Sequence, residues 1–180
     1  MWLSPASLSS LESQPTILIL MGVTGSGKTT VGRLLAEDLG WKYFDADDFH
    51  PAANIEKMKS GVPLTDIDRQ PWLVELRDLI NDCLNNNRPA VLSCSALKDA
   101  YRGILLLDGR VQLVYLRGTP GLIGERLQGR SGHYMNPGLL ESQFETLEEP
   151  SDVLTIDVSM MPAEIVARVK EHFQLQPSQS

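Results

Sequence analysis

A glycine-rich segment, Gly22-Val-Thr-Gly-Ser-Gly-Lys-Thr29, constrains this chain more than any other stretch of its sequence. It matches the pattern G-x-x-x-x-G-K-[ST] and stands between an apolar run and a helical pattern, the context that this motif requires. Its glycines allow the backbone to wrap around a phosphate and to turn N–H groups inward at a helix start. Lys28 then reaches the β- and γ-phosphates, and the Thr29 hydroxyl ligates Mg²⁺.

The sequence therefore predicts a nucleotide-binding loop rather than a chance glycine-rich turn. The predicted binding residues of this phosphate loop are Gly22, Val23, Thr24, Gly25, Ser26, Gly27, Lys28, Thr29 and Thr30.

Apolar runs alternate with amphipathic patterns along the chain. We expect strands over 16–22, 41–45, 90–95, 111–116 and 153–158. Helical patterns separate them, and the clearest, Pro71–Leu84, has an apolar face of 3.6-residue period with Pro71 in its first turn. Such alternation is typical of parallel strands joined by right-handed crossovers. It predicts an α/β fold, a doubly wound parallel five-stranded sheet with helices on both faces and ligands at the carboxyl ends of the strands.

Composition bounds the classes of function. The chain has 180 residues and a formal net charge of −7, which suits one domain and disfavours general nucleic-acid binding, because that needs a basic face. Its longest apolar run is too short to cross a membrane, and two cysteines make no disulfide framework, so we expect a cytoplasmic protein. We expect a flexible extension over residues 1–15, a single domain over 16–175 and a flexible tail over 176–180.

An acidic turn follows the second predicted strand. The third strand ends without the carboxylate that often helps such loops to hold a metal, whereas the turn supplies Asp45, Asp47 and Asp48. We expect one of these carboxylates to support Mg²⁺ and another to accept a proton from an attacking hydroxyl. The alternative is a solvated turn that caps the next helix, and Asp48 is the candidate for that cap.

A basic pair lies further along the chain. Arg126 and Arg130 are four positions apart on a helical pattern, and paired guanidiniums suit a triphosphate. Glycines at 129, 132 and 138 flank a segment with few apolar residues, so we expect a lid over residues 128–139 that carries Arg130 and His133. The alternative is two surface arginines.

Five segments together resemble the P-loop gluconokinases of the thermoresistant type. They are Met21-Gly-Val-Thr-Gly-Ser-Gly-Lys-Thr-Thr30, Asn54-Ile-Glu-Lys-Met58, Gly61-Val-Pro-Leu-Thr-Asp-Ile-Asp-Arg-Gln-Pro-Trp-Leu73, Cys94-Ser-Ala-Leu-Lys98 with Tyr101-Arg102, and Ser142-Gln-Phe-Glu-Thr-Leu-Glu-Glu-Pro150. The resemblance covers nearly all of residues 17–173. It implies a nucleoside-monophosphate-kinase-like fold, ATP-dependent and Mg²⁺-dependent phosphorylation of D-gluconate at its 6-hydroxyl to give 6-phospho-D-gluconate and ADP, and a homodimer.

The resemblance also implies roles for individual residues. Lys28, Asp47 and Arg130 are the expected catalytic residues, and Arg126 joins the phosphate loop in binding ATP. Thr29 and Asp45 are the expected metal ligands. The residues expected to contact the substrate are Asp45, Asp47, His50, Arg69, Lys98, Arg102 and His133. A bidentate arginine suits the gluconate carboxylate.

Ordinary interpretations stay open for several of these residues. Arg69 could be a surface residue at a helix start, Lys98 and Arg102 could be solvated helix charges, and His50 could be a structural turn residue. Leu106 stands where relatives often have an arginine, and the turn sequence leaves open whether Asp47 or Asp48 is the base. A kinase for shikimate or a nucleoside monophosphate, and a nucleotide-binding regulator without turnover, are the competing functions.

Overall fold

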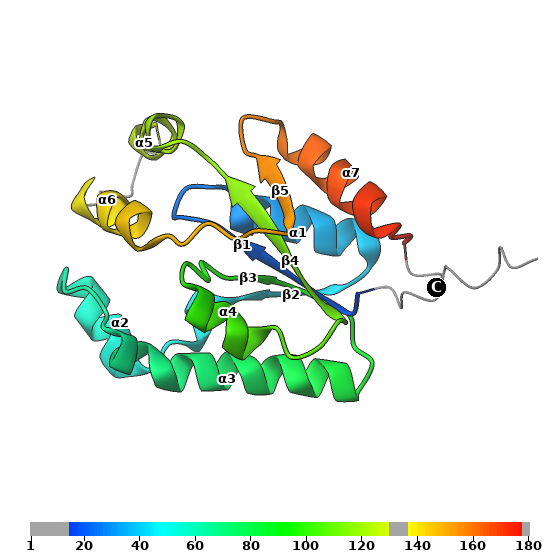
Figure 1. Cartoon of the computed structure of the whole chain (residues 1–180), viewed down its shortest axis with the longest axis horizontal. Coiled ribbons are helices and arrows are strands. Elements are labelled where there is room, and N and C mark those ends of the chain that lie inside the picture. The colour runs from blue at the N-terminus through cyan, green and yellow to red at the C-terminus, as the bar shows by residue number, and fades with distance from the viewer. Residues whose placement is uncertain (1–14, 130–136, 178–180) are drawn as a thin grey trace, which may run out of the picture.

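The computed structural model describes residues 15–129 and 137–177 and forms one parallel five-stranded sheet in the order β2-β3-β1-β4-β5 (Figure 1). The strands are β1 (Ile17–Met21), β2 (Lys42–Asp45), β3 (Ala90–Ser93), β4 (Val111–Arg117) and β5 (Leu154–Asp157). The helices are α1 (Lys28–Leu39), the 3-10 turn η2 (Ala46–Phe49), α2 (Ala52–Lys59), α3 (Asp66–Asn85), α4 (Asp99–Leu105), α5 (Pro120–Gln128), α6 (Pro137–Thr146) and α7 (Pro162–Phe173).

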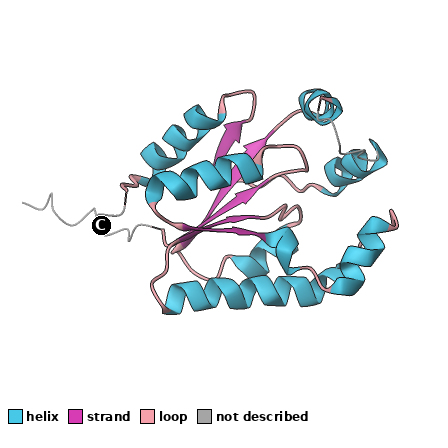
Figure 2. Ribbon diagram, turned by 180° about the vertical axis from the view of Figure 1, so that it is seen from behind, coloured by secondary structure: helices cyan, strands magenta, loops and turns pink. Residues whose placement is uncertain are grey.

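Helices cover both faces of the sheet, with α1 and α7 on one side and α3 and α4 on the other (Figures 1 and 2). The central strand explains why: all five residues of β1 are buried, and successive side chains point to opposite faces. Ile17 and Ile19 belong to the core beneath α3 and α4, whereas Leu18 and Leu20 belong to the core beneath α1 and α7. The doubly wound parallel sheet predicted from the sequence is confirmed.

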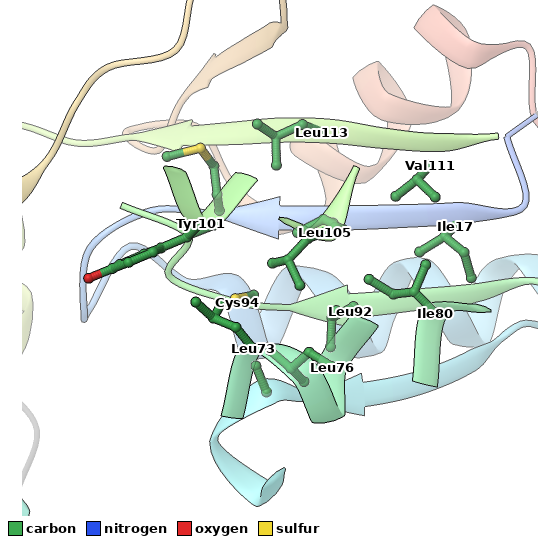
Figure 3. Packing of buried hydrophobic residues seen from close by; sticks show 14 of the residues in the cluster. Ile17, Leu73, Leu76, Ile80, Leu92, Cys94, Tyr101, Leu105, Val111 and Leu113 are labelled. Atoms are coloured by element: carbon green, nitrogen blue, oxygen red, sulfur yellow. The ribbon is translucent and has the colours of Figure 1, made fainter. Parts of the chain in front are cut away.

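The first of these cores is built largely by α3. Figure 3 shows Leu73, Leu76 and Ile80 of this helix packed toward Leu92 of β3 and Ile17 of β1. Each of these side chains is almost completely removed from water. Such burial stabilises the fold by roughly 1.5–3 kcal/mol per aliphatic side chain, and it fixes α3 beneath the strand ends.

Helix α3 begins earlier than the sequence analysis predicted. It starts at Asp66 and not at Pro71, so Pro71 lies inside the helix and not in its first turn. The reason is a capping box: the Thr65 hydroxyl accepts from the Asp68 N–H at 3.2 Å, and the Asp68 carboxylate accepts from the Thr65 N–H at 2.8 Å. This local hydrogen-bond exchange offsets the N–H that Pro71 lacks.

The strand arrows all point toward the end of the sheet where α5 and α6 lie, and residues just beyond the strands therefore meet there (Figure 1). Within the described part of the chain, none of the helices has the length and apolar character needed to cross a bilayer.

Candidate active site

The phosphate loop leaves the carboxyl end of β1 and ends where α1 begins. A side chain at Gly22 would place its Cβ 2.7 Å from both the Leu116 carbonyl oxygen and the Ser26 Oγ, so only glycine fits there. Gly27, the N-cap of α1, has a φ of 94°, a left-handed conformation that glycine adopts without strain. The Ser26 hydroxyl is buried with no hydrogen-bond partner among the described residues. The loop therefore offers an unpaired buried hydroxyl beside a helix N-terminus, which suits a phosphate.

Lys28 is folded back onto its own loop. Its Nζ donates to the carbonyl oxygens of Gly22 and Val23, both at 2.9 Å. Burial lowers the pKa of Lys28, and the nearby carboxylates of Asp47 and Asp45 act in the opposite direction. An ammonium held in this way is already at the phosphate loop, with two acidic groups close enough to influence it.

Asp45 connects the end of β2 to the start of α1. Its Oδ2 accepts from the Thr29 hydroxyl at 3.4 Å and from the Tyr43 hydroxyl at 3.2 Å. Its Oδ1 accepts from the N–H of Asp47 at 3.1 Å, which caps the 3-10 turn η2. The acidic turn and the phosphate loop are thus joined by side-chain hydrogen bonds, although β3 lies between their strands in the sheet.

Asp47 and Asp48 occupy different environments. Asp47 lines the same pocket as Lys28, and its pKa is raised by desolvation and by the charge of Asp45, with Lys28 opposing the shift. Both side chains are exposed, but Asp48 does not line the pocket. The suggestion that Asp48 caps the next helix is wrong, because the N-cap of α2 is Pro51 and no side chain caps it. Pocket position favours Asp47 as the proton acceptor.

A pocket of about 200 Å³ lies over these groups. Its lining residues are Thr24, Gly25, Gly27, Lys28, Thr29, Thr30, Asp45, Asp47, Ser93, Cys94, Ser95 and Gln143. The structure thus brings the phosphate loop and the acidic pair together, as the sequence predicted.

Four lining residues were missed by the sequence analysis. Ser93 ends β3 and Cys94 and Ser95 follow it, so the rule that ligands bind beyond strand ends could have indicated them. Ser93 Oγ donates to the Lys28 carbonyl oxygen at 3.0 Å, while burial raises the pKa of the Cys94 thiol to about 12, so this thiol stays protonated. Gln143 comes from α6, and no local pattern placed it here.

A second group of predicted residues gathers around the Tyr101 ring. The Arg69 guanidinium carbon lies 5.8 Å and the Lys98 Nζ 5.7 Å from the ring centroid. Lys98 is paired with both carboxylate oxygens of Asp66, at 2.8 and 2.9 Å, and the Tyr101 hydroxyl donates to the same carboxylate. Arg69 also donates to the Leu64 carbonyl oxygen. Two cations thus meet at one aromatic side chain, a suitable place for an anionic group.

His50 is linked to this second group through the charge of Arg69. Its ring stacks on Trp72 with centroids 4.5 Å apart, and its Nδ1 is buried without a partner among the described residues. Desolvation and the positive charge of Arg69 lower its pKa. Trp72 is itself buried, as expected, and donates its Nε1–H to the carbonyl oxygen of Ala46 in the acidic turn at 2.7 Å. A neutral imidazole with one unused nitrogen is a candidate contact for a sugar-acid hydroxyl.

The remaining predicted basic residues are placed differently. Arg102 is buried and donates to the carbonyl oxygens of Ala96 and Leu97 at 3.0 and 3.2 Å, so it supports the turn before α4. Arg126 donates to the Val158 carbonyl oxygen. Arg130, His133 and most of the predicted lid over 128–139 lie outside the described residues. Their roles, and the anion contacts predicted for Arg102 and Arg126, stay predictions.

The oxygen donors at the pocket suit Mg²⁺. The Thr29 hydroxyl and the Asp45 carboxylate are hard ligands facing each other beside the phosphate loop. The described residues contain no group of three or more acidic, histidine or cysteine side chains that could cage a metal. Mg²⁺ needs no such cage, since it commonly binds through one or two carboxylates together with substrate phosphates and water.

Comparison with known proteins decides the family. The shikimate kinase family profile matches residues 24–172. A mouse protein named probable gluconokinase is 45% identical, over 87% of this chain and 97% of its own length. The chain belongs to the gluconokinase family. A second member, the gluconokinase of Gluconobacter oxydans, is 42% identical over 89% of this chain and 93% of its own.

Solved structures agree with this assignment. A gluconokinase from Sinorhizobium meliloti superposes with a TM-score of 0.79 at 39% identity, over 89% of this chain and 97% of that one. The expectations of a P-loop kinase and of a gluconokinase-type sequence are confirmed. Leu106, the departure from the family pattern, packs partly buried against the core beneath α3 and α4 in this gluconokinase-family chain.

Proposed function

We propose that this protein transfers the γ-phosphoryl group of ATP to the 6-hydroxyl of D-gluconate, producing 6-phospho-D-gluconate and ADP. The observation that supports phosphoryl transfer most directly is the shared pocket, in which Lys28 and Thr29 of the phosphate loop face Asp45 and Asp47. A pocket that holds phosphates and also presents a carboxylate to an acceptor hydroxyl has the groups such a reaction needs. The names of the related proteins support gluconate as the acceptor.

Each group has a defined part in the proposed reaction. The loop N–H groups and Lys28 hold the phosphates and stabilise charge that develops on the transferring group. Asp47 accepts the proton of the 6-hydroxyl while the bond from O6 to the γ-phosphorus forms and the bond to the β–γ bridging oxygen breaks. The raised pKa of Asp47 suits this part, since a carboxylate with increased proton affinity is a better base. Arg130 is proposed to stabilise the transferring phosphoryl group as well.

Mg²⁺ fits the reaction and would be held by Thr29 and Asp45. When bound with ATP, the ion offsets negative charge on the β- and γ-phosphate oxygens. Asp45 therefore serves the metal, and Asp47 remains available to the acceptor hydroxyl. Asp45 and Asp47, which are joined by a hydrogen bond, thus have different proposed roles, one as metal ligand and the other as base.

The acceptor is proposed to bind between the acidic turn and the residues around Tyr101. Arg69 and Lys98 supply positive charge for the gluconate carboxylate, and the unpartnered Nδ1 of His50 can hydrogen-bond a hydroxyl. Lys98 is already paired with Asp66, so a bound carboxylate shares this ammonium with Asp66 or displaces it. Arg102 is proposed to assist by holding the turn before α4, and His133 by contacting the acceptor.

A coupled assay of ADP release tests the proposal. Purified protein is supplied with MgATP and, in separate reactions, gluconate, shikimate, glycerate or a nucleoside monophosphate. We expect turnover with gluconate, confirmed by detection of the 6-phosphate product, and complete loss of turnover with EDTA. Shikimate is the principal competitor because the shikimate kinase profile matches this chain. Preferred turnover of shikimate would overturn the acceptor assignment, and tight ATP binding without any turnover would indicate a nucleotide-binding regulator.

Two further properties are proposed: an oligomeric state, from the family resemblance, and a location, from the cysteine content of the chain. We propose a homodimer located in the cytoplasm. Light scattering after size exclusion measures the mass of the particle, which should be about twice the 19.9 kDa of one chain. A single-chain mass at the protein concentration of the activity assay would contradict the dimer.

A further inference from the structure

The segment Ser142–Pro150, which carries the family resemblance but has no part in the reaction proposed above, touches both halves of the site. Gln143 lies on α6, and its Oε1 accepts from the backbone N–H of Thr24 at 2.7 Å. Because the partner is an N–H donor, the side-chain oxygen and not the nitrogen must face it. The bond links residues 119 positions apart and ties α6 to the phosphate loop.

The other end of this segment holds the turn that carries Lys98. The Glu148 N–H donates to the Leu97 carbonyl oxygen at 2.9 Å, and the Glu148 carboxylate accepts from the Asp99 N–H at 2.6 Å. Both partners adjoin Lys98, the N-cap residue of α4. Glu148 thus fixes the backbone on either side of a residue proposed to bind the acceptor.

The stretch between these ends is firmly anchored. Leu147 packs against the hydrophobic clusters on both faces of the sheet. The Thr146 hydroxyl donates to the Ser142 carbonyl oxygen at 2.7 Å. Immediately after Glu148, the Glu149 carboxylate accepts from the Tyr115 hydroxyl and from Arg117 Nε, both at 3.0 Å. A short segment with this much packing transmits a displacement at one end to the other instead of absorbing it.

We infer that Gln143 and Glu148 are positioning residues at the two ends of a bridge, residues 143–148, that couples nucleotide binding to acceptor binding. Bound phosphates draw the N–H groups of the loop inward and so fix the orientation of the Thr24 peptide. The hydrogen bond from Thr24 to Gln143 then fixes the position of the bridge. Glu148 then fixes the turn around Lys98. Coupling of this kind is reciprocal: each ligand tightens the other by the same factor. The acceptor half of the inference rests on the proposed function.

Calorimetry with a non-hydrolysable ATP analogue, with and without saturating gluconate, measures the coupling in the full-length protein. In the wild type we expect gluconate to tighten analogue binding by about fivefold or more, the lower end of typical allosteric factors. Gln143→Met should weaken binding of the analogue alone and reduce the coupling factor to below about two. Glu148→Met, which removes the oxygen that accepts the Asp99 N–H, should leave binding of the analogue alone within about twofold and abolish the coupling as well.

Two matched controls separate the bridge from general effects of substitution. Gln112→Met removes a glutamine hydrogen bond, to the Gly109 carbonyl oxygen, near the amino end of β4. Glu145→Met makes the same replacement at an exposed acid of α6 itself. Both controls should keep the wild-type coupling factor. If Gln143→Met fails to fold, Gln143→Ala is measured in its place.

Hydrogen exchange with the analogue alone provides a readout that needs no acceptor. The analogue should slow exchange of the amides over residues 97–102 in the wild type and controls, and should have no effect there in either bridge variant. Wild-type coupling and protection in both bridge variants would overturn the inference, as would the absence of coupling and protection in the wild type. If gluconate does not bind but the analogue still protects residues 97–102, the acceptor assignment fails and the bridge stands.

Discussion

The Asp45 carboxylate lies 3.4 Å from the Thr29 hydroxyl and joins the end of β2 to the first turn of α1. The two residues are 16 positions apart, yet they meet because β2 and the phosphate loop both end at the same edge of the sheet. The remaining oxygen of Asp45 holds the Asp47 N–H. One carboxylate therefore positions the proposed metal ligand and the proposed base at the same time.

The first prediction concerns the metal requirement. Asp45→Asn keeps the shape of the side chain but removes its charge, so the Mg²⁺ concentration that gives half-maximal activity should rise about tenfold or more. Titration of activity with Mg²⁺ at saturating ATP measures this shift. Asp78→Asn, which removes an exposed acid from α3, serves as the control and should titrate like the wild type. An unchanged requirement in Asp45→Asn would remove Asp45 from the metal site.

The second prediction concerns the pH dependence of the rate. Desolvation and the charge of Asp45 raise the pKa of Asp47, so its base form is lost at a higher pH than for an ordinary aspartate as the solution is acidified. We expect kcat/KM to fall on the acid side with an apparent pKa above the ordinary value of about 3.9. Asp47→Asn should retain ATP binding, lose most of the rate and lose this acid limb. An inactive Asp48→Asn beside a near-normal Asp47→Asn would show that the other carboxylate is the base.

The third prediction concerns Lys28. Its ammonium rests on the Gly22 and Val23 carbonyl oxygens, already at the position from which it can reach a phosphate. Lys28→Met should lower kcat by roughly 10²-fold or more, comparable to the loss of one preorganised donor. Lys42→Met, at the opposite end of β2 from the acidic turn, is the matched control. Equal rates for these two variants would contradict the role of Lys28.

The fourth prediction concerns two helical glycines. A Cβ on Gly32 would lie 2.7 Å from the Tyr43 ring and 2.9 Å from Ser93 Oγ, because α1 packs closely on β2 and β3. Gly32→Ala should therefore destabilise the protein by about 1–3 kcal/mol, as overpacked cores do. Gly103→Ala on α4 meets no atom within 4 Å and should stabilise by up to about 1 kcal/mol, since alanine favours a helix. Thermal unfolding measures both, and changes of the same sign would contradict the packing argument.

The fifth prediction concerns acid stability. Hydrogen bonds from Lys57 and from the Thr65 amide and hydroxyl hold the pKa of Asp68 at about 2. A carboxyl group with a depressed pKa stabilises the folded state above its unfolded pKa of about 3.9, and that stabilisation is lost as the pH falls toward 2. The difference in Tm between wild type and Asp68→Asn should thus be largest near neutral pH and smallest below pH 2. Lys57→Met should reduce the pH-dependent part of the difference, and a constant difference across this range would contradict the assignment.

Two features that differ from the sequence-based predictions have local signals in the sequence. The capping box of α3 is written locally as Thr65-x-x-Asp68, and it overrides the preference of Pro71 for a helix start. Ser93 and Ser95 lie at the carboxyl end of the buried strand β3, and parallel sheets bind their ligands at the carboxyl ends of the strands. Both features are local, so neighbouring residues suffice to predict them.

The sequence by itself determined the features whose physics is local. The phosphate loop is specified by consecutive residues, because glycine conformations and a following helix start suffice to build it. The layered sheet follows from the alternation of apolar strands with amphipathic helices, since each must bury its apolar side against the other. The acidic turn was placed near the loop by the rule that parallel strands end at one edge.

Only the tertiary structure decided which distant side chains meet. Gln143 reaches Thr24 across 119 positions, and Asp66 meets Lys98 across 32. Arg102, which the sequence presents as one more basic residue near the substrate, is buried against two carbonyl oxygens of its own turn. The packing of helices on the sheet sets these partners, and a hydrogen bond forms only where that packing brings donor and acceptor within about 3 Å, a condition that residue type and spacing do not encode.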